Sequence, residues 1–225
     1  MILVGVIDAY TAKLGTSNFF IMSGSVSGVD LLEVHASNCP IDGGLYQTSS
    51  KLELSTSNAP ITVKIFVFND PKGNDSSAVL RTSNREIDSS ITLVSTAESG
   101  TGGKFDLSAQ TSNVWLFVDV LSAPVDSTIN LDARTSNEGA AVALPPAYEG
   151  RFYASSSIPG ARVIVGKAKD PADKGRQRHV EWSVEQDNKS VIGTAFWEKE
   201  NEHRGNVSVQ TSNGGVEISL HRSMD

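Results

Sequence analysis

Lys51-Leu-Glu-Leu-Ser-Thr-Ser-Asn58 contains the tripeptide around which the whole chain repeats. Copies of Thr-Ser-Asn end at Asn18, Asn58, Asn84, Asn113, Asn137 and Asn213, and a copy with alanine in its first position ends at Asn38. The residue two places before each threonine position and the residue three places after each asparagine are apolar. The unit apolar-x-Thr-Ser-Asn-x-x-apolar indicates a repeat protein.

Apolar and polar residues alternate strictly around the motif, as in Lys51–Asn58 and Gly205–Asn213. A period of two places alternate side chains on opposite faces of a strand. No stretch sustains the i, i+3, i+4, i+7 pattern of an amphipathic helix. The sequence therefore predicts an all-β fold.

The motif asparagines follow one another at intervals of 20, 20, 26, 29, 24 and 76 residues. A period in the twenties without helices is typical of a β-solenoid, or β-helix, whose rungs stack on one another. Because the last interval has room for about three rungs, we expect roughly ten in all. An antiparallel sandwich with one motif per hairpin is the alternative. We expect a single domain with regular rungs over 1–137, irregular rungs over 138–204, and a closing rung and tail over 205–225.

Alternation also predicts how the motif is oriented. If the preceding apolar residue points inward, the threonine points inward, the serine outward, and the asparagine inward or into the corner between two strands. Alanine at position 36 fits an inward first position. Buried polar side chains need partners, and stacking at one register lets each copy bond to the copies above and below. We expect a structural ladder of Asn18, Asn38, Asn58, Asn84, Asn113, Asn137 and Asn213.

The motif is missing between Glu138 and His203, where we expect a hairpin or an irregular insertion. Strands are predicted over 151–154 and 161–166. A loop over 167–178 then carries five basic and two acidic residues in an otherwise acidic chain. Alternation resumes over 179–185 and 191–197, and a turn over 186–189 would join the two as a hairpin.

Composition limits the partners and the compartment. A net charge of −7 and a pI near 5.1 disfavour binding to nucleic acid. The single cysteine, Cys39, has no disulfide partner within the chain, so it is either a small buried apolar residue or an exposed thiol. No window is apolar enough for a membrane span, and no ordinary secretory signal opens the chain. We expect a cytoplasmic protein or one exported by another route, and a mature form numbered from a new methionine stays open.

The repeated motif, with Asp170-Pro-Ala-Asp-Lys-Gly-Arg-Gln-Arg-His-Val-Glu-Trp182 and a closing Val-Ser-Val-x-Thr-Ser-Asn rung, resembles an uncharacterised domain family of basidiomycete fungi. That family is in turn similar to bacterial adhesin-like β-solenoid domains with Ser-Asn-Gly corners. The resemblance covers roughly the whole chain. It implies a fold and an adhesin-like role, and it supplies no catalytic residues.

The basic loop offers one candidate binding site. An anionic group, such as a phosphate or an acidic sugar, could be bound by six residues, namely Lys174, Arg176, Arg178, His179, Glu181 and Trp182. The alternative is that the loop neutralises the acidic rod or pairs with Glu181 and Glu185.

Other chemistry finds little support in the sequence. The acidic residues Glu33, Glu53, Asp88, Asp106 and Asp132 fall at unlike registers relative to the motif, and the four histidines show no metal-ligand spacing. We predict no catalytic residues, no metal and no cofactor. Stacked threonines suggest ice binding, but alternation turns them inward.

The sequence thus predicts a non-enzymatic, adhesin-like structural or binding module, with a carbohydrate-active enzyme as the alternative. Its predicted partners are polysaccharide or cell-wall material, and further copies of itself joined end to end or edge to edge, because the open ends of a solenoid present unpaired strands.

Overall fold

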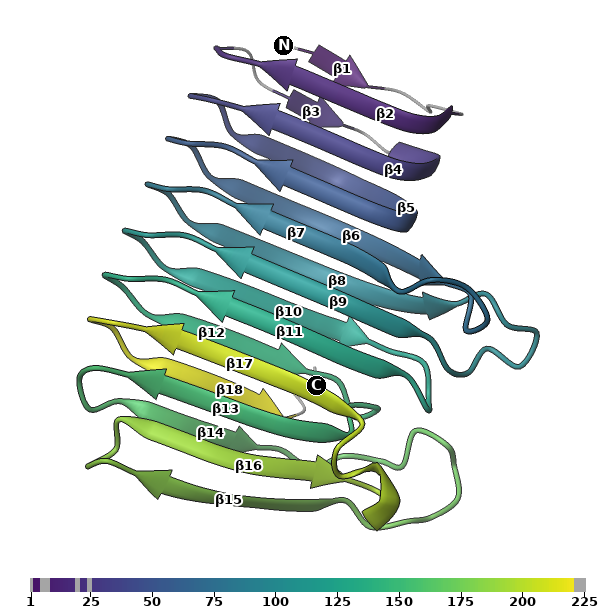
Figure 1. Cartoon of the computed structure of the whole chain (residues 1–225), viewed down its shortest axis with the longest axis vertical. Helices are drawn as coiled ribbons and strands as arrows, with labels where there is room; N and C mark the ends of the chain where they lie inside the picture. The colour runs from purple at the N-terminus through teal and green to yellow at the C-terminus, as the bar shows by residue number, and fades with distance from the viewer. Residues whose placement is uncertain (1, 5–8, 19–20, 24–25, 221–225) are drawn as a thin grey trace.

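The computed structural model describes residues 2–4, 9–18, 21–23 and 26–220, and it is all-β (Figure 1). Within these residues the only helical element is a short 3-10 helix, η1 (Lys199–Asn201). The strands are β1 (Ile2–Val4), β2 (Ala9–Thr16), β3 (Ile21–Ser23), β4 (Val26–Ala36), β5 (Ile41–Ser55), β6 (Ile61–Asn69), β7 (Ser76–Arg81), β8 (Ile87–Ser95), β9 (Lys104–Gln110), β10 (Leu116–Ser122), β11 (Thr128–Arg134), β12 (Ala140–Leu144), β13 (Gly150–Ser156), β14 (Ala161–Val165), β15 (His179–Glu185), β16 (Ser190–Phe196), β17 (Gly205–Thr211) and β18 (Val216–Leu220).

The strands form two ladders that face each other. One ladder runs β2, β4, the end of β5, β7, β9, β11, β17, β13, β16 and β15, and the other runs β1, β3, the start of β5, β6, β8, β10, β12, β18 and β14. Every pairing in both ladders is parallel except those of β16 with β13 and β15. The chain therefore coils, and each turn adds one strand to each ladder, which differs from the pairing of an antiparallel sandwich.

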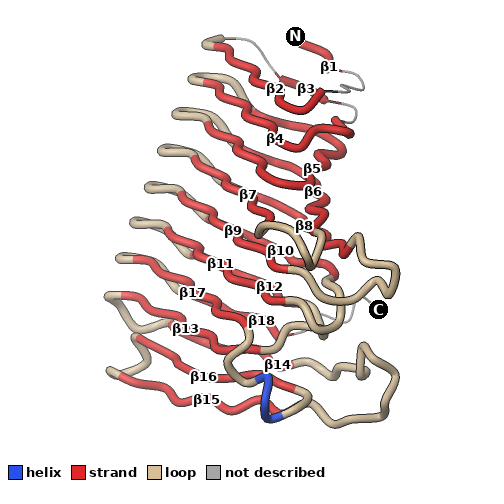
Figure 2. Tube along the Cα trace, turned by 45° about the vertical axis from the view of Figure 1, so that its right-hand side comes forward, coloured by secondary structure: helices blue, strands red, loops and turns tan. Residues whose placement is uncertain are grey.

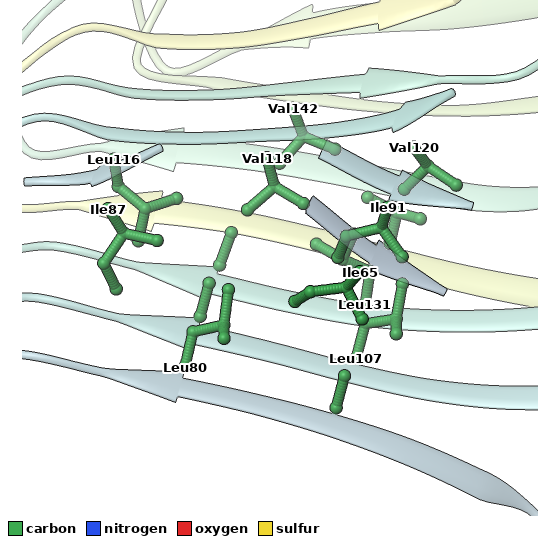
Figure 3. Close-up of a cluster of buried hydrophobic side chains, with 14 of the residues drawn as sticks. Ile65, Leu80, Ile87, Ile91, Leu107, Leu116, Val118, Val120, Leu131 and Val142 are labelled. Atoms are coloured by element: carbon green, nitrogen blue, oxygen red, sulfur yellow. The ribbon is translucent and has the colours of Figure 1, made fainter. Parts of the chain in front are cut away.

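The core lies between the two ladders. Strand β6 shows the alternation directly, because its odd-numbered residues from Ile61 to Asn69 are buried and the residues between them are exposed or half-buried. Figure 3 shows side chains from both ladders meeting in this space, among them Leu80 and Leu131 from one ladder and Leu116 and Val142 from the other. Because each turn adds apolar area, the core extends along the stack.

The order of the turns departs from the order of the chain. Strands β17 and β18 lie between β11–β12 and β13–β14, so the last marked turn is inserted before the segment that precedes it in sequence (Figure 1). The 76-residue interval between Asn137 and Asn213 therefore separates two neighbours in space. Eight two-strand turns are present among residues 9–220, namely β2/β3, β4/β5, β5/β6, β7/β8, β9/β10, β11/β12, β17/β18 and β13/β14, so the expected count of about ten is not confirmed.

The region over 138–204 is more regular than its sequence indicates. Strands β12, β13 and β14 all join the parallel ladders, and the predicted hairpin is confirmed as β15 and β16, paired from His179 with Phe196 to Glu185 with Ser190. The turn between them uses left-handed backbone at Gln186, Asp187 and Asn188. The irregular part reduces to the loops over 145–149 and 166–178 and the crossing that contains η1.

The motif residues occupy the corners on one side of the stack, seen in Figure 2 as a column of short loops. The seven asparagines form a continuous ladder in which each side-chain amide donates to the side-chain carbonyl of the preceding copy, at N–O distances between 2.7 and 3.2 Å. The expected ladder is therefore present. The asparagine side chains lie exposed in the corner, not inside, and the serines of the described corners are exposed or half-buried.

The threonines point inward, but they do not bond to one another. Each buried hydroxyl donates to the backbone carbonyl of the residue that follows the asparagine in the neighbouring turn. These bonds run from Thr56 to Cys39, Thr82 to Ala59, Thr111 to Arg85, Thr135 to Val114 and Thr211 to Glu138, at 2.7 to 3.4 Å. A nearby backbone acceptor satisfies each hydroxyl, so no threonine ladder is needed.

An eighth, degenerate copy of the motif closes the series. Ser156 pairs in register with Thr211, and its hydroxyl donates to the carbonyl of Gly214 at 2.6 Å, which repeats the threonine rule. The asparagine position is taken by Ile158, where the asparagine ladder ends. The sequence signal was present, since Ala154-x-Ser-Ser-Ile-x-x-Ala161 keeps the apolar spacing of the unit.

Candidate functional site

The basic segment over 167–178 is held in shape from within by Asp170, and its arginines connect it to the rest of the protein. The buried Asp170 carboxylate accepts from the Arg176 guanidinium at 2.7 and 3.0 Å and from the backbone amides of Ala172, Lys174 and Arg176. These bonds, with that from the Arg176 side chain foremost, hold the pKa of Asp170 well below its usual range. Arg176 also pairs with Glu198 at 2.7 Å. The loop therefore uses its central arginine internally.

Arg178 is turned into the protein. Its Nη2 donates to the carbonyl of Tyr148 at 3.3 Å, while Nε and Nη1 are buried without a hydrogen-bond partner among the described residues. Burial lowers the pKa of the Arg178 guanidinium to about 10, and Glu149 and Tyr148 oppose that shift. This cation is not presented to a ligand in solution.

The remaining predicted ligands do not converge on one point. Lys174 is exposed, and its side chain forms no ion pair with the residues that the structure describes. His179 stacks on Phe196 with ring centroids 5.3 Å apart. Glu181 shares a face of β15 with His179, whereas Trp182 lies on the opposite face by strand alternation. The six residues named from the sequence therefore do not build one anion site, and neither Glu181 nor Glu185 is the partner of the basic loop.

Glu149 organises a polar cluster that the sequence did not indicate. This buried carboxylate accepts from the backbone amides of Trp197 and Glu198, at 2.7 and 3.2 Å, and from the side chains of Asn201 and Arg204, at 2.9 and 3.2 Å. A buried charge with several donors is stable where an isolated one would not be. The cluster fastens the crossing that carries the chain from β16 to β17.

A hollow of about 590 Å³ lies along the corners, at the start of β14, whereas the basic loop follows the end of that strand. It is lined by Trp115, Pro159, Gly160, Ala161, Arg162, Asn188, Gly215, Val216 and Glu217. Backbone bonds stack Leu116 on Gly139, Ala140 on Gly215 and Val216 on Gly160, so these three glycines occupy the register of Trp115 in successive turns. The floor of the hollow is therefore bare backbone.

Trp115 stands at one end of this glycine row. A Cβ added at Gly139 would lie 2.0 Å from the Trp115 ring, so the indole packs directly over that glycine. The side chain is still 47% exposed. Arg162 and Glu217, paired at 2.6 Å, supply charged groups at the other side of the hollow. The signal in the sequence was the second residue after the asparagine position, which is Trp, Gly and Gly in the last three marked turns.

A second hollow, of about 420 Å³, lies on the outer face of β9, β11 and β17 and is lined by Asp106, Leu107, Asn130, Leu131, Asp132, Arg134, Asn206 and Ser208. Both carboxylates are engaged, since Asp106 accepts from Asn130 at 2.9 Å and Asp132 pairs with Arg134 at 2.8 Å. Glu33 and Glu53, expected at unlike registers, are direct neighbours in the ladder and alternate with Lys13, Lys51 and Arg81 in a row of ion pairs.

In the described part of the chain, no group of three or more His, Cys, Asp and Glu side chains could hold a metal ion, and no helix is long and apolar enough to cross a membrane. His221 lies outside the described residues. Comparison of the chain with family models, curated proteins and solved structures gives no match.

Proposed function

We propose that the protein is a non-enzymatic, adhesin-like β-solenoid that binds an extended saccharide along its corners. The observation that carries the proposal is the row in which the exposed Trp115 lies over Gly139 and is followed by Gly215 and Gly160. An aromatic ring beside bare backbone offers a flat apolar surface, and ligand sites combine such surfaces with a few oriented polar groups.

The polar groups at the hollow suit a hydroxylated, uncharged or weakly acidic chain. Arg162 is largely exposed and donates to Glu217, so both a cationic donor and a carboxylate acceptor border the glycine row. Sugar hydroxyls both donate and accept, which matches this pair. Because its lining extends from Trp115 to Arg162 across several turns, the hollow would accommodate an internal segment of a polymer.

The regular stack supports a binding role because it holds the site in one shape. The turns β9/β10, β17/β18 and β13/β14 line the hollow, and the bonds of Asn137 to Asn113 and of Asn213 to Asn137 join the first two of these corners through the corner of β11/β12. A preformed site avoids the entropic cost of ordering loops on binding. The rigidity that the motif confers thus serves recognition at the neighbouring positions.

The test is Trp115→Ala, measured by affinity electrophoresis and calorimetry against soluble cell-wall glucans, mannans and chitin oligomers. We expect an about 5- to 150-fold weaker association with the saccharide that the parent binds, because an aromatic platform contributes about 1–3 kcal/mol. Leu121→Ala is the matched control, since Leu121 is 44% exposed but lies outside the hollow. Equal binding by parent and Trp115→Ala, or no binding by the parent, would contradict the proposal.

The enzyme alternative is assigned to the second hollow, where Asp106 and Asp132 lie on one outer face. We expect no release of reducing ends from the polysaccharide that the parent binds. If such release occurs and is abolished by Asp106→Asn or Asp132→Asn, the protein is a carbohydrate-active enzyme instead.

A further inference from the structure

Most of the exposed large apolar side chains gather at one end of the stack. Of eight such residues in the described chain, only Trp115 and Leu121 lie elsewhere. The other six are Ile158, Ile164, Val165, Trp182, Val184 and Ile192, at the end formed by β13 to β16. By strand alternation Ile164 and Ile192 lie on the outer faces, whereas Val165, Trp182 and Val184 lie on the inner faces, and exposed apolar side chains that share a face mark an interaction site.

This end of the stack is stepped. One ladder stops at β14, whereas the other continues past β13 by two more strands, β16 and β15 (Figure 1, bottom). Strand β15 is an open edge without lysine, proline or bulge, the features by which edge strands normally avoid pairing. Among the described residues, no strand lies opposite the inner face of β15 in this overhang.

The inner face of the overhang continues the core. Phe152 of β13 is in register with Gly193 of β16, which is in register with Trp182 of β15. Since Phe152 points into the core, so does Trp182, yet Trp182 is 47% and Val184 49% exposed. On the shorter ladder, Val165 shares the inward register of Ala161 and is 43% exposed.

The free backbone groups of β14 belong to its inward-facing residues. The Gly160 carbonyl and the Gly166 amide bond to β18, whereas the Ala161 amide points the other way, to Asn188. Alternation along the strand then directs the amides and carbonyls of Val163 and Val165 to the open edge.

The same holds for β15. In β13 the Glu149 carbonyl bonds to Gly205 of β17, and the Ser156 amide bonds to Lys189 on the other side. Alternation carried through β16 leaves the backbone groups of Val180, Trp182 and Val184 directed to the open edge. Both open edges therefore present free backbone groups at residues with inward side chains.

We propose that this end binds a second copy of the chain about a two-fold axis parallel to the strands. Such a rotation keeps strand direction, exchanges the two ladders and reverses the stack. The two-strand overhang of each copy then fills the step of the other. Strand β15 runs parallel to β13, because both are antiparallel to β16. Strand β14 runs in the opposite direction to β13, because the corner between them reverses the chain. Since the rotation keeps strand direction, β15 meets β14 of the second copy antiparallel.

The pairing places Trp182 opposite Val165 and Val184 opposite Val163 of the second copy, so the apolar side chains close into one continuous core. Among the outward-facing residues, Glu185 lies opposite Arg162 of the second copy, and the two side chains carry opposite charges. Pairing of β15 with itself would also satisfy the backbone, but it would leave the inner face of the overhang open. The interlocked dimer covers both edges and that face.

The test uses cysteine pairs in a Cys39→Ala background, so that no native thiol remains. Opposed residues of an antiparallel pair lie within disulfide reach. We expect Trp182→Cys combined with Val165→Cys to give a disulfide-linked dimer under mild oxidation, on a non-reducing gel and by light scattering at twice 23.9 kDa. Either single variant should remain uncrosslinked.

Val184→Lys in the native background separates assembly from folding, because this half-exposed position tolerates lysine in a monomer. We expect it to retain the parent's circular dichroism and to be monomeric where the parent is dimeric. Efficient crosslinking of Trp182→Cys alone would show pairing of β15 with itself and overturn the interlocked arrangement. A parent that is monomeric up to about 100 µM would overturn self-association, independently of saccharide binding.

Discussion

Asn84 lies in the middle of the asparagine ladder, donating to Asn58 and accepting from Asn113 at 2.7 Å each. None of the motif asparagines has a positive φ, so the corner uses asparagine for its side-chain amide, which both donates and accepts a hydrogen bond. Because the side chain is exposed, water competes for these bonds. The ladder therefore fixes register along the corners more than it adds stability.

We expect Asn84→Ala to lower the free energy of unfolding by about 0.5–1.5 kcal/mol, less than a buried ladder would lose. The measurement is urea unfolding followed by circular dichroism. Ser83→Ala, in the same corner but with an exposed hydroxyl, is the control and should change little. An unchanged unfolding midpoint in Asn84→Ala would show that the ladder does not stabilise the fold.

Asp170 gives the protein a stability that depends on pH. Its pKa is lowered in the folded state, so the ionised carboxylate stabilises the fold at all pH values above its unfolded pKa of about 4, and this contribution is lost as the pH falls below it. We expect Asp170→Asn to be less stable than the parent at neutral pH and to approach the parent in acid. Urea unfolding at neutral and acidic pH would measure the difference.

Asp173→Asn is the matched control, because Asp173 belongs to the same loop but is largely exposed in its pair with Lys169. It should behave as the parent does throughout the series. A constant deficit of Asp170→Asn down to the lowest pH would mean that the carboxylate acts by its shape and not by its charge.

At the scale of the elements, two glycines allow β17 to lie between β11 and β13. A Cβ added at Gly150 would lie 2.2 Å from the carbonyl oxygen of Gly205, and one added at Gly205 would lie 2.6 Å from that of Ile129. Gly150 also has a φ of 150°, in the region that favours glycine. The start of the inserted strand thus depends on close backbone contact at both sides.

We expect Gly205→Ala to lower the free energy of unfolding by about 1–3 kcal/mol, because the backbone on either side must move to admit a methyl group. Gly15→Ala is the control, since no atom lies within 4 Å of a Cβ added there. Chemical unfolding of both variants decides the matter, and equal midpoints would contradict the close packing of β17.

Local pattern was sufficient to predict the strands, the inward threonines, the corner asparagines and the hairpin of β15 and β16. Each of these depends on residues a few positions apart, whose alternation is visible in the sequence. The place of β17 was not predictable, because identical motifs specify which turns can stack but not in which order. The Gly150–Gly205 contact and the bonds from Asn213 to Asn137 and from Thr211 to Glu138 are among the contacts that join the inserted turn to its observed neighbours.

For the candidate site too, the sequence showed local patterns but not the contacts between distant residues. Basic residues concentrated over 167–178 suggested an anion site, but Asp170 and burial of Arg178 absorb the two arginines, which a count of charges does not reveal. Trp115 was not predicted as a site residue, because its partners Gly139 and Gly215 are 24 and 100 residues away in sequence. Gly139 joins Trp115 through the stacking of successive turns, whereas Gly215 joins the row only because the last marked turn is inserted next to β12.

At the scale of the whole molecule, the stack has different ends. One end carries the stepped apolar surface of β14 and β15, and the hollow proposed to bind saccharide begins at the same end turn, at Gly160 and Arg162, and reaches to Trp115. An interlocked dimer would therefore place two hollows on one continuous rod. Two linked sites on one polymer raise the effective concentration of each for the other, so a weak site would suffice for firm attachment.

The inserted turn also affects how the chain is assembled as it leaves the ribosome. Strands β13 to β16 emerge before β17, yet in the finished protein they contact the rest of the stack largely through β17 and β18. Growth from the first turn onward can proceed in order only as far as β12. The following segment must then wait, or settle against β12 and be displaced, until the final strands arrive to separate the two. Synthesis order and spatial order thus differ at one point, and the native order of the turns is complete only once β17 and β18 are in place.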